Sequence, residues 1–181
     1  LALPWHGSSA AEAQGTSWRW FAEPPASQMS SAASESAGVN YLLSAQVLLD
    51  LCGTTDNPAR VWAKPVPSTK LRLSVLTVSQ VRAFVRSVSG TADGERAWAR
   101  LADLLAKIKA DGGDPLLFGE GASVAWQSLM NEPTLGNMDH IERLFYATAF
   151  SEGLCVVEYD HAHSGALGPL GIKVRSLGHQ G

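Results

Sequence analysis

The stretch Tyr41–Leu51, YLLSAQVLLDL, joins a short apolar run to an amphipathic one. Residues 39–43 (VNYLL) predict a buried strand. Residues 45–51 predict a helix whose apolar side carries Val47, Leu48 and Leu51. The polar residues Ser44 and Gln46 stand at this junction. In a parallel α/β domain, ligands bind at such junctions, because the carboxyl ends of the strands open onto a crevice. These two polar residues therefore bear on function.

The alternation of apolar strands and amphipathic helices continues to the end of the chain. Further strands are predicted at residues 71–76, 115–118, 154–158 and 171–177, and helices at residues 78–88, 95–110, 121–130 and 138–153. The longest helix places large apolar side chains on one face: Trp98, Leu101, Leu104, Leu105 and Ile108. Residues 53–69, rich in Pro and polar side chains, predict a loop. Strands that alternate with helices predict an α/β fold with a mostly parallel sheet covered on both faces.

The composition limits the class of protein. The chain has 181 residues, of which 45% are hydrophobic and 17% charged, so it can form a substantial core. A net charge of −3 argues against a protein that coats nucleic acid through bulk charge. No apolar run approaches the roughly 18 residues of a membrane span. Cys52 and Cys155 lie far apart without metal-ligand spacing, and both are predicted to be buried thiols.

The N-terminal segment differs from the rest. It is rich in Ala and Ser and has no hydrophobic periodicity, so we predict an irregular extension over residues 1–38 and a domain over residues 39–181. An intact transit peptide is Arg-rich and poor in acids, whereas this segment has three Glu and one Arg. Its aromatic cluster is typical of anchors at protein interfaces, which makes these residues candidates for partner binding: Trp5, Trp18, Arg19, Trp20 and Phe21. The alternative is that the segment folds back on its own domain.

The order and spacing of the segments in residues 39–178 resemble the PIN (PilT N-terminus) domain, the fold of many small toxin–antitoxin ribonucleases. The most specific part is IERLFYATAFSEGLCVVEYD, residues 141–160, in which an acid, an Ala-Thr-Ala helix, a Gly and a buried strand recur at fixed spacing. The resemblance implies a three-layer sandwich with a central, mostly parallel sheet. Residues 1–38 have no counterpart in the family.

The resemblance also implies an altered active site. Family members cleave RNA with a divalent metal ion held by about four carboxylates, because Mg²⁺ prefers anionic oxygen ligands. Ser44 stands where the family has its first Asp, Gln46 where Asn is common, and Gln80 where it has Glu. Glu142 replaces an Asp, and Asp160 matches a position often filled by Asp or Asn. Because two of four carboxylates are replaced, we expect a degenerate site with no catalytic residue and no bound metal ion.

Local structure offers its own explanation for the two replacements. Ser is a favoured N-cap, so Ser44 is predicted to cap the helix that follows it. Gln80 lies three residues after Thr77, a spacing that predicts a capping box with Thr77 as the cap. If a Mg²⁺ or Mn²⁺ ion binds nonetheless, its ligands are expected to be Glu142 and Asp160, with Asp139 as a substitute one turn before Glu142.

Two further groups of residues have a functional and a neutral interpretation. His161 and His163 flank Ala162 beside Asp160, a spacing that suits a transition-metal pair on a strand but is usually neutral in a polar loop. Basic residues gather between positions 60 and 86, and three of them are candidates for contact with RNA: Arg72, Arg82 and Arg86. The alternative for these cations is a solvated surface.

Together these patterns favour a non-catalytic PIN-like subunit that binds the other proteins of a larger assembly. The resemblance makes a ribonucleoprotein, for example an organellar ribosome, the first candidate, and a mitochondrial location then comes before a cytoplasmic one. The acidic net charge counts against that candidate. The alternatives are a Mg²⁺- or Mn²⁺-dependent endoribonuclease and a regulatory binder of one small protein.

Overall fold

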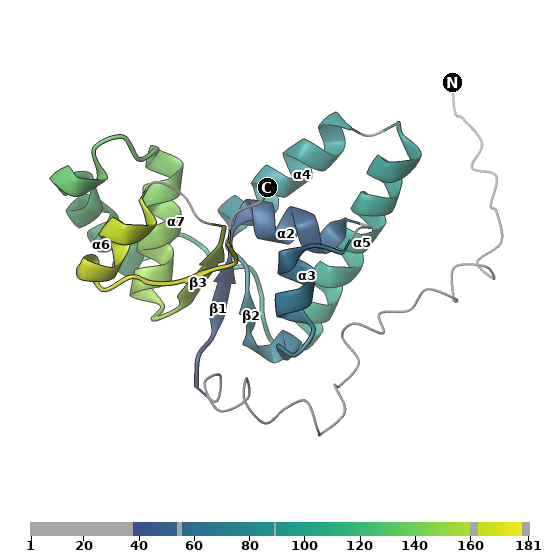
Figure 1. Ribbon diagram of the computed structural model, residues 1–181, viewed down its shortest axis with the longest axis horizontal. Coiled ribbons are helices and arrows are strands. Elements are labelled where there is room, and N and C mark those ends of the chain that lie inside the picture. The colour runs from purple at the N-terminus through teal and green to yellow at the C-terminus, as the bar shows by residue number, and fades with distance from the viewer. Residues whose placement is uncertain (1–37, 54–55, 89, 160–162, 179–181) are drawn as a thin grey trace.

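The computed structural model describes residues 38–53, 56–88, 90–159 and 163–178 (Figure 1). They contain a four-stranded, fully parallel sheet in the order β2-β1-β3-β4. The strands are β1 (Tyr41–Leu43), β2 (Leu71–Arg72), β3 (Cys155–Glu158) and β4 (Lys173–Ser176). In the register of the central strand, Leu42 lies opposite Arg72 on one side and Val156 on the other. The predicted α/β fold with a parallel sheet is confirmed.

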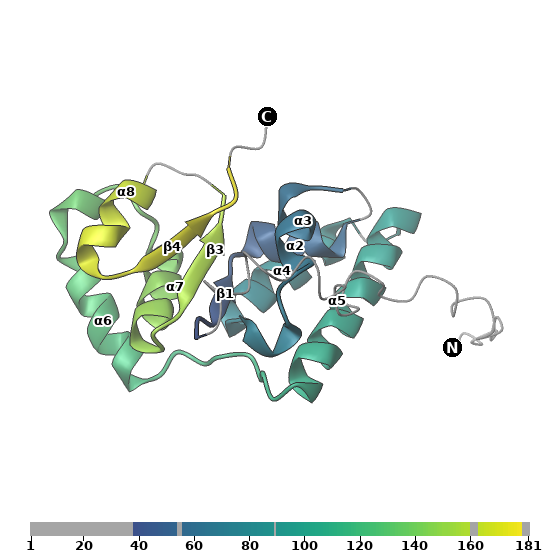
Figure 2. The ribbon, with the colours of Figure 1, turned by 60° about the horizontal axis from the view of Figure 1, so that its bottom comes forward.

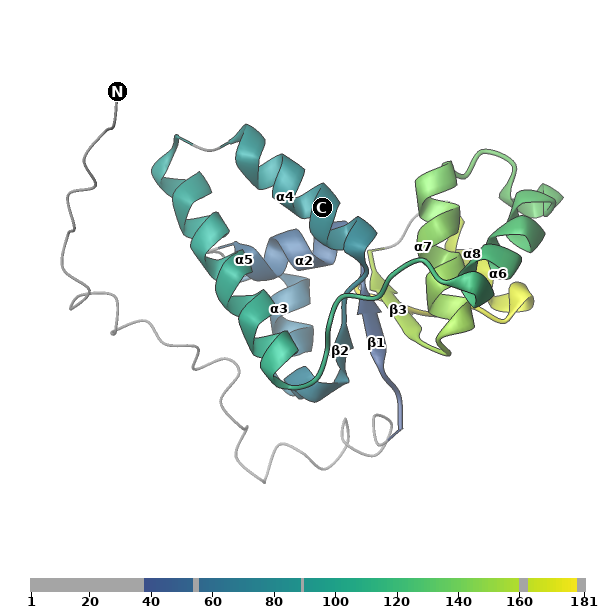
Figure 3. The same cartoon turned by 180° about the vertical axis from the view of Figure 1, so that it is seen from behind.

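Helices form a layer on each side of the sheet (Figures 1 and 3). One layer contains α2 (Ala45–Cys52), α3 (Pro58–Ala63), α4 (Val75–Ser87) and α5 (Ala92–Ala110). The other contains α6 (Glu120–Met130), α7 (His140–Ser151) and the short α8 (Ser164–Leu167). Because side chains alternate along a strand, Leu43 packs under the first layer and Leu42 under the second. The result is the predicted three-layer sandwich.

Serine hydroxyl groups set where the two helices nearest the sheet begin. The Ser44 side chain accepts a hydrogen bond from the N–H of Val47, so the predicted cap of α2 is confirmed. The predicted cap of α4 is wrong: Ser74, not Thr77, accepts the bond, at 3.0 Å from Thr77 N. Thr77 is instead a buried helical residue whose hydroxyl donates to Leu43 O at 3.2 Å. Gln80 is therefore not part of a capping box.

Three other local predictions need correction. Residues 53–69 contain α3, because Asn57 caps a helix that starts with Pro58. The strand predicted over residues 71–76 stops at Arg72, since the Ser74 cap starts α4, and the one predicted over residues 115–118 is a single bridge between Leu116 and Ser74. Trp98 is 43% exposed, beside a hollow that Val85 and Arg86 of α4 also line, rather than in the core with the other apolar residues of its face.

Both cysteines are free thiols inside the domain. Cys52 is buried and Cys155 half-buried. Burial raises the pKa of Cys52 to about 12, although the nearby charge of Arg100 opposes the shift. Neither thiol is therefore a reactive thiolate at neutral pH. The prediction of a buried thiol is confirmed for Cys52, whereas Cys155 is only half-buried. Among the helices that the structure describes, none is long and apolar enough to cross a membrane.

Arg143 fixes the second helical layer. Its side chain is 6% exposed, and it donates to the main-chain oxygens of Leu129 (2.5 Å), Leu135 (2.7 Å), Met138 (3.2 Å) and Gly136 (3.3 Å). These four oxygens belong to the end of α6 and the connection to α7. A single guanidinium group thus donates hydrogen bonds to main-chain carbonyl groups that would otherwise be buried without a donor.

We expect the substitution Arg143→Met to lower the free energy of unfolding by about 3 kcal/mol, because it leaves several buried carbonyl groups without a donor. Urea unfolding monitored by circular dichroism measures the change. The matched control is Arg82→Met on the exposed side of α4, which should change stability by no more than about 0.5 kcal/mol. Equal losses in the two variants would contradict the role given to Arg143.

Candidate functional site

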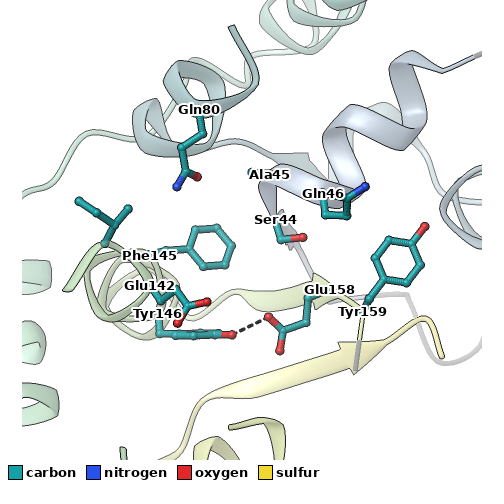
Figure 4. Close-up of a pocket in the computed structure, with 10 residues that line it drawn as sticks. Ser44, Ala45, Gln46, Gln80, Glu142, Phe145, Tyr146, Glu158 and Tyr159 are labelled. Atoms are coloured by element: carbon teal, nitrogen blue, oxygen red, sulfur yellow. Dashed lines mark hydrogen bonds between the residues drawn. The ribbon is translucent and has the colours of Figure 1, made fainter. Parts of the chain in front are cut away.

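A pocket of about 310 Å³ opens where the carboxyl ends of β1 and β3 meet α4 and α7 (Figure 4). The junction of β1 and α2 contributes Ser44, Ala45 and Gln46, and α4 contributes Gln80. The remaining lining comes from α7 and the end of β3: Ile141, Glu142, Phe145, Tyr146, Glu158 and Tyr159. The structure therefore brings Ser44, Gln80 and Glu142 of the predicted degenerate site together. Asp160, the fourth member, lies outside the described residues.

The polar side chains that the β1–α2 junction and α4 contribute to the pocket are neutral. The Ser44 hydroxyl caps α2, and the main-chain N–H of Ser44 donates to Val157 O at 3.0 Å. Gln46 donates from Nε2 to Oδ1 of Asp50 at 3.0 Å, one helical turn away. The side chain of Gln80 is exposed and points into the pocket from α4 (Figure 4). None of these three side chains adds negative charge.

Glu158 is a pocket residue that the sequence analysis missed. It ends the strand CVVE and is only 4% exposed. The buried Tyr146 hydroxyl donates to Glu158 Oε2 at 2.6 Å (Figure 4). Burial, and then the negative charge of Glu158, raise the pKa of Tyr146 well above its usual value. The detectable signal was an acid in an otherwise apolar strand, on the same face as Val156.

The acids of α7 have separate roles. Asp139 is the N-cap of the helix, and its Oδ1 accepts a hydrogen bond from the N–H of Ile141 at 2.6 Å. It does not line the pocket, so the structure does not bring it to the site as a substitute ligand. Glu142 is exposed in the first helical turn, where the partial positive charge of the helix N-terminus stabilises a carboxylate.

The described residues do not fit a Mg²⁺ or Mn²⁺ ion. Such an ion prefers several anionic oxygen ligands. The pocket offers the carboxylates of Glu142 and Glu158, and the second accepts a hydrogen bond from Tyr146. Within residues 38–53, 56–88, 90–159 and 163–178, no three His, Cys, Asp or Glu side chains are grouped to hold a metal ion. His163 is half-buried just before α8, and its predicted partner His161 lies outside these ranges.

The apolar part of the lining includes Ile141 and two aromatic rings. Ile141 is 40% exposed, and the rings of Phe145 and Tyr159 are half-buried at the pocket wall. Tyr159 is held in place because its hydroxyl donates to Oδ2 of Asp50 at 2.5 Å. A pocket with fixed aromatic walls, neutral amides and two carboxylates can hold an organic group by contact and hydrogen bonding.

The three predicted RNA-contact residues lie on two elements. Arg72 lies on β2 and donates from Nη1 to the main-chain oxygens of Thr69 and Leu71, at 2.8 and 2.9 Å. Arg82 and Arg86 are exposed on α4. The aromatic cluster between Trp5 and Phe21 lies outside the described residues.

The burial of the Tyr146 hydroxyl against Glu158 can be tested through the pH dependence of protein stability. A Tyr pKa that is raised in the folded protein adds stability below pH 10, and this contribution is lost as the pH rises above the unfolded pKa. We expect Tyr146→Phe to lower the free energy of unfolding by about 2 kcal/mol at pH 8. The gap between the wild type and Tyr146→Phe should shrink by about 1.4 kcal/mol between pH 8 and 11, because Phe cannot ionise. Urea unfolding at both pH values measures the gap, and a constant gap would contradict the burial of this hydroxyl.

Comparisons with known proteins find similarity in structure alone. No protein-family model matches the chain, and no curated protein matches its sequence. Among solved structures, FitAcB from Neisseria gonorrhoeae matches with a TM-score of 0.60 and 20% identity, over 76% of this chain and 97% of that chain. VapBC2 from Rickettsia felis, bound to a DNA fragment from its promoter, matches with a TM-score of 0.60 and 10% identity, over 78% and 100%.

A third similar structure is VapBC-5 from Mycobacterium tuberculosis, a member of the VapBC family of toxin–antitoxin systems. Its TM-score is 0.56 and its identity 15%, over 76% of this chain and 98% of that chain. At these identities the similarity shows the fold alone, so any conclusion about chemistry has to come from the residues of the pocket. The described residues of this chain therefore have a PIN-like fold.

Proposed function

We propose that this protein is a non-catalytic, PIN-like subunit that acts by binding other proteins in a larger assembly. The observation that carries the proposal is the state of the β1–α2 junction. Ser44 occupies the position at the carboxyl end of the central strand, and its hydroxyl group is used to cap α2. A neutral side chain there supplies no charge to a metal ion, and each missing carboxylate removes a charge-assisted contact in a poorly screened pocket.

Exposed apolar side chains support a role in protein binding. Phe84 of α4 and Val88, the residue that follows the helix, are 51% and 36% exposed and line the same hollow, and Trp98 of α5 is 43% exposed beside a second hollow. Large apolar side chains grouped on a surface are typical of interaction sites. One of the similar structures, VapBC-5 from Mycobacterium tuberculosis, is a member of the VapBC family of toxin–antitoxin systems.

A ribonucleoprotein, such as an organellar ribosome, is the assembly we place first. The exposed cations of α4, Arg82 and Arg86, would then contact RNA phosphates, while the acidic net charge of −3 requires most of the binding energy to come from protein contacts. Sedimentation of the native protein in a gradient, with and without ribonuclease treatment of the extract, tests this assignment. A shift to lighter fractions after treatment is the result the ribonucleoprotein predicts.

The alternative is a Mg²⁺- or Mn²⁺-dependent endoribonuclease that uses Glu142 and Asp160. One observation favours it: Glu142 shares a pocket with Ser44 and Gln80, as an inherited metal site requires. The two functions differ in one property, since only the enzyme depends on the remaining carboxylates.

We expect the purified 181-residue protein to show no cleavage of single-stranded RNA in the presence of Mn²⁺ above the background rate of the variant Glu142→Ala/Asp160→Ala. Product formation from a labelled RNA is followed over hours, and circular dichroism shows that both proteins are folded. Cleavage by the wild type that disappears in the double variant would establish the enzyme and overturn the proposal. Equal, background rates support it, because an enzyme that needs these acids would separate the two proteins.

A further inference from the structure

The outer strand β4 has no helical cover on the α2–α5 side, in the part of the chain that the structure describes. Lys173 and Arg175 of β4 lie opposite Cys155 and Val157 of β3. Val157 belongs to the core under α2–α5, so the alternation of side chains places all four residues on that side. Lys173 and Arg175 are exposed and Cys155 is half-buried. We call the surface formed by Cys155, Lys173 and Arg175 the open face; β4, which carries its two cations, is the outer strand of the sheet (Figure 2).

The open face is strongly cationic for its size. In the described residues, neither Lys173 nor Arg175 lies within ion-pair distance of a carboxylate. Both are close enough to Cys155 to act on its thiol: burial raises the pKa of Cys155, and the two cations oppose that rise. Two neighbouring cations without an acidic partner favour a negatively charged occupant.

An aromatic hollow continues the open face at the end of β4. The hollow has a volume of about 600 Å³. Val61, Trp62, Arg175 and Leu177 are among the residues that line it, and one acid, Asp56, lines it as well. Val61 is 60% exposed. The Trp62 ring packs edge-on against Tyr41 with a centroid distance of 5.3 Å, so the wall of the hollow is fixed. A hollow of this size, with an aromatic wall and a cation at its edge, suits large aromatic side chains.

The N-terminal extension has the complementary chemistry. It contains Glu12, Glu23 and Glu35 but a single cation, Arg19. It also contains four large aromatic residues in an otherwise Ala- and Ser-rich sequence: Trp5, Trp18, Trp20 and Phe21. Acidic residues and aromatic residues are the two kinds of side chain that the open face and its hollow are suited to bind.

The extension joins the domain at the edge of the open face. Asn40, just before β1, accepts a hydrogen bond from the N–H of Cys155 at 2.9 Å. Tyr41, Cys155 and Lys173 lie side by side on adjacent strands, so Lys173 is about 10 Å from Tyr41 across the sheet. Glu35 precedes Tyr41 by six residues, which span up to about 20 Å. The chain is therefore long enough to bring Glu35 to Lys173.

We propose that the segment from Trp18 to Glu35 docks on the open face of its own chain. Glu35 pairs with Lys173 at the amino end of β4, and the aromatic residues of Trp18–Phe21 occupy the hollow beside Trp62. This placement covers the open face and buries aromatic side chains that would otherwise face water. It does not depend on whether the pocket at Ser44 is catalytic.

A protease test uses the fact that Arg19 is the one Arg in residues 1–37. The 181-residue protein is digested with an arginine-specific protease, and the product lacking residues 1–19 is followed by mass spectrometry. In Lys173→Glu/Arg175→Glu, cleavage after Arg19 should be at least about tenfold faster than in the wild type, because the released segment is open to the enzyme. The matched control Arg82→Glu/Arg86→Glu makes the same change in charge on α4 and should leave the rate unchanged.

A second pair of variants tests the contact itself. Glu35→Lys introduced into Lys173→Glu should restore slow cleavage after Arg19, since the reversed pair attracts again and the protease does not cut at Lys. Equal rates in the wild type and Lys173→Glu/Arg175→Glu would overturn the proposal. Protection of the Arg19 site from the protease that disappears on dilution would also overturn the proposal. The open face would then be occupied by the segment of a second copy of the chain. Protection that appears only after another protein is added would assign the segment to a partner.

Discussion

The parallel pairing of β1 between β2 and β3 is the constraint on which the rest of the structure depends. It brings the carboxyl ends of β1 and β3 to the same edge of the sheet. Ser44 continues this pairing by one residue, because its N–H donates to Val157 O, and its hydroxyl then starts α2. Thr77 attaches α4 to the same edge through Leu43 O. The pocket forms where these connections converge with α7.

What the pocket can do follows from which side chains those connections leave available. Ser44 is used as a cap, and Tyr146 donates to Glu158. Glu142 is the exposed acid of the lining. In a site of this kind, a metal ion would have to compete with a hydrogen bond from Tyr146 and would find neutral groups at the end of the central strand. Binding through apolar and aromatic surfaces requires no such competition.

The sequence predicted most of the architecture because its apolar periodicities are strong. The strand 154–158 and the helices near residues 95–110, 121–130 and 138–153 were found within a few residues of their observed bounds. Two of the errors have a common physical cause: a short polar side chain starts a helix where the sequence pattern predicts a strand or a loop. Ser74 ended the predicted strand 71–76 early, and Asn57 started a helix inside a predicted loop.

The candidate site was predicted in part. Ser44, Gln80 and Glu142 are far apart in sequence and close in the fold, which a resemblance to a family can reveal and composition cannot. Glu158 was missed because its importance depends on Tyr146, twelve residues away and on another element. Asp139 was predicted as a substitute ligand because of its spacing from Glu142, but its carboxylate is used as the cap of α7.

The most direct test of the account is a calorimetric titration of the 181-residue wild type with Mn²⁺, beside the variant Ser44→Asp/Gln80→Glu. The account predicts that the wild type shows no saturable binding up to about millimolar Mn²⁺, and that restoring two carboxylates tightens binding at least about tenfold. A wild-type site that saturates at micromolar Mn²⁺ and is lost in Glu142→Ala would contradict the account, because the pocket would then be a working metal centre.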